Sequence, residues 1–203
     1  MNDDGTWAPS LADLPGVEYV PPEGTGRPRL AAGHAAPRVS HHEYDGSARA
    51  WLSWETRDGS TSASPAQRYF SERPADEGPT SEVVRRLHEG LALPGTPSDY
   101  HFAIQRVIDA LWKRRRTDPE AVVPIEGLCL LDIAIVEAYP GPFRAGDRFV
   151  SMTSTRLLVS LYERAGDLDA AVALARRVEP FLGGADEVER LEEKRGRLAE
   201  EGP

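Results

Sequence analysis

The spacing of apolar residues divides the chain into two stretches that follow different rules. Residues 1–79 hold nine prolines and eight glycines, spread so evenly that no window accommodates a helix of ordinary length. After Pro79, apolar residues recur at intervals of three and four positions, which is the pattern of helices with one buried face. We therefore expect an irregular N-terminal segment over residues 1–79 and a helical domain over residues 80–203.

The second stretch predicts six helices, of which the third is apolar at nearly every position and should be surrounded on most sides. The start of this third helix is left open, because two different prolines suit a first helical turn. The expected helices run from Thr80 or Ser81 to Pro94, from a cap at Ser98 or Asp99 to the cluster 113–116, from Asp118 or Pro124 to Tyr139, from about Thr153 to Ala165, from Asp167 to about Leu182, and from Asp186 to about Glu201.

The first stretch has too many aromatic residues for a flexible tail. We expect it to be partly ordered and to lie against the helical domain, with disorder as the alternative. Short strands are expected at Val17–Val20 and Ala48–Thr56, with Trp51 and Trp54 on opposite faces of the second. Residues 58–65 are rich in Ser, Thr and Gly and predict an exposed loop.

One segment near the C-terminus carries the pattern of a tight helical hairpin. Gly166 closes the first helix, Asp167 can cap the second, and the small Ala171 lets the two helices approach closely. Leu158 and Tyr162 lie one turn apart in the first helix. Over about residues 153–182 this pattern resembles a tetratricopeptide repeat (TPR), although the family's terminal proline is displaced here to Pro180.

The resemblance implies an all-α fold of antiparallel helical hairpins, a TPR-like or α-solenoid fragment. The preceding helix pair, ending at Pro140, suggests a second, divergent unit with Trp112 in its first helix. The final helix, which suits a capping role, is similar to the tail of helical-repeat effector domains in bacterial transcription activators. No DNA-binding segment is evident upstream, so their DNA-binding role is not carried over. In the TPR family the first helix lines the concave binding surface, which by position implies Thr153, Arg156, Ser160 and Arg164.

A formal net charge of −9 argues against broad attachment to nucleic acid or to an anionic membrane. One local cluster is an exception, with a tryptophan that could stack on a base and four cations that could hold phosphates. The other interpretation is structural, because cations favour the last turn of a helix and the tryptophan continues an apolar stripe. The cluster comprises Trp112, Lys113, Arg114, Arg115 and Arg116.

Individual residues give few signs of chemistry. Asp132 lies in the apolar helix and should be paired, for which we expect an arginine. His41-His42-Glu43-Tyr44-Asp45 carries metal-capable side chains, but adjacent positions point apart, so we expect an exposed polar turn. His88 and His101 are expected at the surface or at helix boundaries, and Cys129 in the core. No catalytic or cofactor-binding motif is found, so we expect no metal, cofactor or catalytic residue.

These observations favour a protein-interaction, scaffold or regulatory module that binds another protein or a peptide through a TPR-like groove. A regulatory protein that binds nucleic acid or phosphate through residues 113–116 is the second hypothesis. An enzyme with a site between the two stretches, involving His41, His42 or Asp132, is the third. The sequence has no signal peptide or membrane-spanning stretch and a single cysteine, which predict a cytoplasmic protein. The arginine-rich, lysine-poor composition suggests GC-rich codons and a bacterial source.

Overall fold

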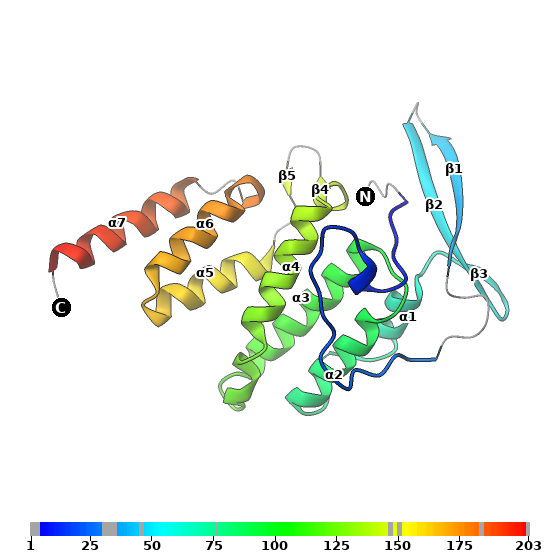
Figure 1. Ribbon diagram of the computed structural model, residues 1–203, viewed down its shortest axis with the longest axis horizontal. Helices are drawn as coiled ribbons and strands as arrows, with labels where there is room; N and C mark the ends of the chain where they lie inside the picture. Colours follow the sequence, from blue (N-terminus) through cyan, green and yellow to red (C-terminus); the bar gives the residue numbers. More distant parts are fainter. Residues whose placement is uncertain are drawn as a thin grey trace. The chain divides into compact units, whose positions relative to one another are not determined.

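The chain forms two compact units, residues 1–143 and residues 144–203. The computed structural model describes residues 5–29, 36–44, 47–75, 77–145, 148–149, 152–182 and 185–201 (Figure 1). Unit 1 contains β1 (Arg38–Tyr44), β2 (Ser47–Thr56), β3 (Gly59–Thr61), α1 (Pro65–Ser71), α2 (Thr80–Leu91), α3 (Pro97–Arg114) and α4 (Ile125–Ala138). Unit 2 contains β4 (Arg144–Ala145), β5 (Arg148–Phe149), α5 (Thr153–Ala165), α6 (Leu168–Leu182) and α7 (Ala185–Glu201).

Helices dominate both units, which confirms the expected fold class in part, but the fold is not all-α. Unit 1 contains a three-stranded antiparallel sheet in the order β1-β2-β3 (Figure 1). The predicted strand around Trp51 and Trp54 is confirmed as β2, and the two indoles lie on opposite faces, with Trp51 59% exposed and Trp54 2% exposed. The strand that the sequence analysis did not predict is β1, because its residues are mostly polar. Residues 38–44 pair along their whole length with β2.

Other local expectations for the first stretch also change. The expected polar turn at His41–Asp45 is wrong for the residues that the structure describes, because His41, His42, Glu43 and Tyr44 belong to β1. Residues Val17–Val20 form no strand, and the expected loop at 58–65 contains β3. The short helix α1 begins after Ser64, whose hydroxyl accepts a hydrogen bond from the amide of Gln67.

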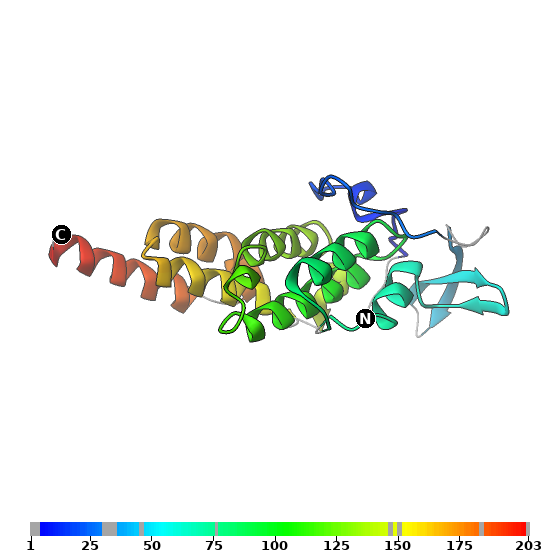
Figure 2. The ribbon, with the colours of Figure 1, turned by 90° about the horizontal axis from the view of Figure 1, so that it is seen from below.

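The core of unit 1 lies among α2, α3 and α4, which are seen side by side in Figures 1 and 2. α3 is the central element, because it contacts α1, α2 and α4. Most of its apolar residues at helical spacing are buried, as the sequence pattern predicts: Tyr100, Ile104, Val107, Ile108 and Leu111. Trp112, which continues the stripe, is half-buried. α4 buries half of its residues, while Leu130, Leu131 and Ala134 are half-buried and form a partly open side, so the helix is less enclosed than the sequence predicts.

The N-terminal segment shares this core. Leu11, Leu14 and Val17 are buried, and the backbone of Ala8 pairs with that of Gly95 through two hydrogen bonds of 2.9 and 3.1 Å. The hydroxyl of Tyr139 donates to the carbonyl of Pro15 over 2.7 Å. The first compact unit therefore extends to residue 143, whereas the change of sequence pattern lies at Pro79.

Two helix starts differ from the sequence expectation. α3 is capped by Thr96, whose hydroxyl accepts from the amide of Asp99 while the Asp99 carboxylate accepts from the amide of Thr96. This capping box places Pro97 in the first turn. Ahead of α4, both of the proposed starts are used: Asp118 caps a short 3-10 turn, and the α-helix itself follows Pro124.

Unit 2 contains the helical hairpin that the sequence predicts, and the bounds of α5 agree with the prediction. Gly166 has a φ of 81°, in the left-handed region that ends helices, and the Asp167 carboxylate accepts a hydrogen bond from the amide of Ala170 over 3.0 Å. Ala171 and Ala175 are buried at the start and middle of α6. Small side chains there let α5 and α6 pack closely.

Ion pairs link α7 to the two helices before it. Glu163 of α5 accepts from Arg190 and from Lys194, each over 2.8 Å. Within α7, Glu187 pairs with Arg190 over 2.8 Å. Two other side chains of α7 reach across to α6, where Glu192 pairs with Arg176 and Arg195 with Asp169.

Two glycines of unit 2 should respond in opposite directions to replacement by alanine. Gly166→Ala forces a Cβ atom into a left-handed conformation and should lower the free energy of unfolding by about 1 kcal/mol. Gly196 is exposed in the interior of α7, and a Cβ atom there would meet no neighbouring group within 4 Å. Gly196→Ala should therefore raise the free energy of unfolding by about 0.5–1 kcal/mol. Urea denaturation followed by circular dichroism measures both, and equal effects would contradict the hairpin geometry.

The ion pairs of Glu163 should make unit 2 sensitive to acid. Hydrogen bonds from Arg190 and Lys194 lower the pKa of Glu163 to about 2. A carboxyl group whose pKa is depressed by folding stabilises the protein above its unfolded pKa, and this contribution is lost as the pH falls toward 2. Glu163→Gln should therefore reduce stability at neutral pH and flatten its decline below pH 4.5. Chemical denaturation between pH 7 and pH 2 tests whether Glu163 is responsible for the acid sensitivity. Glu179→Gln, at an exposed position of α6, is the control.

Candidate functional site

The four residues that the TPR resemblance implies lie on one face of α5. Their spacing of three and four positions aligns them along the helix. Thr153, Arg156 and Arg164 are exposed and Ser160 is half-buried, while Leu157, Leu158 and Val159 are buried. Within the described part of the chain, the side chains of Arg156 and Arg164 form neither a hydrogen bond nor an ion pair.

The cluster at the end of α3 divides into two parts. The guanidinium of Arg115 stacks on the ring of Trp112 at 3.7 Å from its centroid and also donates to the Trp112 carbonyl, so these two side chains engage each other. Lys113 and Arg114 instead line an open groove of about 870 Å³ beside α3. Arg116 is exposed and does not line this groove.

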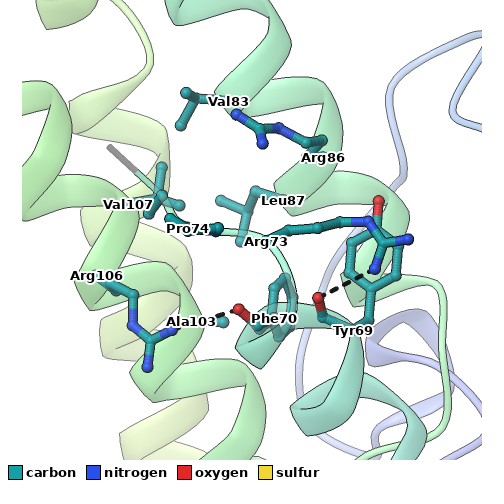
Figure 3. A pocket seen from close by; sticks show the side chains of 11 residues that line it. Tyr69, Phe70, Arg73, Pro74, Val83, Arg86, Leu87, Ala103, Arg106 and Val107 are labelled. Atoms are coloured by element: carbon teal, nitrogen blue, oxygen red, sulfur yellow. Dashed lines mark hydrogen bonds between the residues drawn. The ribbon is translucent and has the colours of Figure 1, made fainter. Parts of the chain in front are cut away.

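A second, smaller hollow adjoins that groove. It measures about 20 Å³ and lies among α1, α2, α3 and the residues after α1. Buried apolar side chains form its floor, and Figure 3 shows three arginines around it. Phe70, Pro74, Ala75 and Arg106 line both cavities, which makes them one continuous surface. We call this surface the basic groove; its basic residues are Arg73, Arg86, Arg106, Lys113 and Arg114.

Backbone carbonyl groups hold the arginines of the basic groove in place. Arg106 donates to the carbonyl of Phe70 over 3.4 Å, and Arg114 donates to that of Gly78 over 2.8 Å. Arg73 lies over the ring of Tyr69, 4.1 Å from its centroid, and Arg86 donates to the carbonyl of Glu77. Sequence reasoning missed Arg73, Arg86 and Arg106, because they come from three separate segments and form no local motif.

A buried histidine and aspartate join α3 to α4. Nδ1 of His101 lies 2.6 Å from Oδ1 of Asp132, and the two side chains are 1% and 0% exposed. Gln105 donates to the other carboxylate oxygen over 3.4 Å, and the ring of Phe143 lies 4.4 Å from the His101 ring. Asp132 is paired, as expected, while an arginine partner for it stays a prediction; the expected surface position of His101 is wrong, because its side chain is buried. A polar residue near a helix start is usually exposed, and nothing in the local sequence shows that this one points inward.

The other candidate residues lie in separate places. His41 and His42 are exposed on β1. His88 is half-buried in the last turn of α2, where its Nδ1 lies 2.8 Å from the hydroxyl of Tyr19, and burial lowers its pKa. Cys129 is buried as expected, and burial together with nearby Asp132 raises the pKa of its thiol to about 12. Among the described residues, no three His, Cys, Asp or Glu side chains are grouped to hold a metal ion.

Comparison of the chain with protein-family models, with curated proteins and with solved structures finds no match. Within the described ranges, no helix has the length and apolar character needed to cross a membrane.

Replacing Asp132 tests whether the buried pair supports the fold of unit 1. Asp132→Ala leaves the His101 ring without its carboxylate in a site closed to water, and should cost about 3–5 kcal/mol of unfolding free energy. Asp109→Ala, on the exposed side of α3, is the control and should change stability by less than about 0.5 kcal/mol. Urea denaturation measures both. A loss at Asp132 as small as that at Asp109 would refute the structural role.

Proposed function

We propose that this protein is an interaction module, and that unit 2 binds another protein through the exposed face of α5. The observation that carries this proposal is the pair of exposed arginines, Arg156 and Arg164, which align with Thr153 and Ser160 on that face. Exposed arginine is enriched at the centres of protein interfaces, where its planar group binds carboxylates and stacks on aromatic rings.

The local geometry of the hairpin supports a TPR-like assignment for unit 2. The left-handed Gly166, the Asp167 cap and the buried Ala171 occur in the order that the repeat requires. In such repeats the first helix of a hairpin lines the binding surface, and α5 is that helix here. α7 then takes the place of a following helix, since Arg190 and Lys194 attach it to α5 through Glu163.

The distribution of ion pairs in unit 2 supports a distinct role for the α5 face. Arg176, Arg190 and Arg195 each pair with a carboxylate of a neighbouring helix and so contribute to packing. Arg156 and Arg164 have no such partner in the described residues. Their charge is therefore available to a ligand, and an acidic partner surface is the complement that we expect.

Site-specific photocrosslinking in the native cell tests the proposal. A photoreactive amino acid at Thr153, on the α5 face, should give a discrete adduct with a partner protein. The same amino acid at Ala173, which is exposed on α6, should not. Reversing one charge with Arg156→Glu should reduce the Thr153 adduct about tenfold, because it replaces attraction to the partner with repulsion.

The matched control for this experiment is Arg197→Glu, which makes the same change of charge on an exposed position of α7. It should leave the Thr153 adduct unchanged. Adducts of equal yield from Thr153 and Ala173, or equal losses with Arg156→Glu and Arg197→Glu, would overturn the assignment of the α5 face. Thermal unfolding of each variant confirms that the fold is intact.

A further inference from the structure

The geometry points to a second binding site, independent of the α5 face. We infer that the basic groove of unit 1 binds an acidic peptide segment that carries a small aliphatic residue.

The charge of the basic groove is opposite to that of the whole chain. Five basic side chains line it, while the acidic residues among its described lining are Asp109 and Asp118. Asp118 already accepts from the hydroxyl of Thr80 over 2.6 Å. Arg73 and Arg86 pair with Glu72 and Glu82, which lie outside the lining, over 3.4 and 3.7 Å. The complementarity to an acidic ligand therefore depends chiefly on Arg106 and Lys113, in a chain with a formal charge of −9.

The arginines of the groove are held in position before any ligand arrives. Each is oriented by a backbone carbonyl near the end of α1 or in the loop that follows. A guanidinium has five N–H donors, so a single bond to Phe70 leaves most donors of the exposed Arg106 for a carboxylate. Fixed side chains lose less conformational entropy on binding, which raises affinity.

The small hollow supplies an apolar anchor point between these cations. Val83, Leu87, Ala103 and Val107 are nearly fully buried around it, and Phe70 forms one side (Figure 3). Its volume of about 20 Å³ is close to the space of one water molecule, so it admits a methyl group at the tip of an aliphatic side chain but no aromatic ring. A valine-sized residue between acidic neighbours matches both features.

Peptide fits the basic groove better than nucleic acid does. Asp109 is exposed on the groove wall between Arg106 and Lys113, and it would repel a continuous phosphate backbone, which has no N–H donor to offer. A peptide presents amide N–H groups, which can donate hydrogen bonds to this carboxylate. Two aromatic rings near these cations are already stacked by guanidinium groups, because Arg73 covers a face of Tyr69 and Arg115 covers a face of Trp112, so those faces are not open to a base.

The length of the groove sets the size of the ligand. Its α3 wall runs from Ala103 to Arg114, where the helix ends. At a rise of 1.5 Å per residue this wall is about 17 Å long, which an extended peptide of about five residues covers.

Fluorescence polarisation with the full chain tests the inference. The probe is a labelled peptide with a central valine flanked by three glutamates on each side. We expect a dissociation constant below about 100 μM at low ionic strength, weakening as salt is added. Replacing the central valine of the probe by glycine should weaken binding about tenfold, and replacing it by tryptophan should weaken it similarly, because the hollow is small.

The matched protein variants are Arg106→Glu, in the groove, and Arg116→Glu, C-terminal to the same helix but outside the groove. The first should weaken binding of the valine peptide more than tenfold, and the second by less than about twofold. Arg106→Lys keeps the charge, so its affinity for the valine peptide should lie between those of Arg106→Glu and Arg116→Glu. Circular dichroism and thermal unfolding show whether each variant is folded.

Three results would overturn the inference. The first is equal loss of peptide binding in Arg106→Glu and Arg116→Glu, and the second is equal affinity for the valine and glycine peptides. The third is tighter binding of a single-stranded oligonucleotide of the same charge, which would make the groove a general polyanion site. The Thr153 photocrosslink should persist in Arg106→Glu, so failure of this site and failure of the α5 face are distinguishable.

Discussion

The hydrogen bond between His101 and Asp132 is the constraint on which the arrangement of unit 1 depends. Both side chains are almost completely buried, so each needs the other, and together they fix how α3 and α4 lie against each other. Apolar packing alone tolerates sliding of one helix along another, because it has no preferred direction. A buried polar pair does not, and Gln105 on the next turn of α3 adds a third member.

With α3 fixed in this way, its two sides serve different purposes. One side buries Ile104, Ile108 and Leu111 in the core. The other carries Arg106, Asp109 and Lys113 at the wall of the basic groove. The opposite wall comes from the end of α1 and the loop to α2, whose carbonyl groups accept from arginines of α2 and α3. Hydrogen bonds to carbonyl groups at the end of α1 and in the following loop therefore place these cations.

Unit 2 is assembled by a different balance of forces. Its helices are amphipathic, and apolar contacts between α5 and α6 are supplemented by ion pairs from α7. These pairs are partly exposed, so their contribution is modest and depends on salt and pH. The arginines of α5 that take no part in them form the face that we propose for partner binding, so the two units carry separate proposed surfaces of the same sign of charge.

The sequence by itself determined the features that depend on neighbours along the chain. Helical spacing of apolar residues predicted most helices, the Gly166–Asp167 pair predicted the hairpin turn, and alternation predicted the opposite faces of Trp51 and Trp54. Only the tertiary structure decided which distant residues meet. β1 is polar and becomes a strand through pairing with β2, His101 turns inward because Asp132 lies opposite it, and Arg73, Arg86 and Arg106 gather from three segments. A local sequence pattern predicts on which face of its own helix or strand a side chain lies. Which distant residue that side chain contacts depends on how the helices and strands pack together.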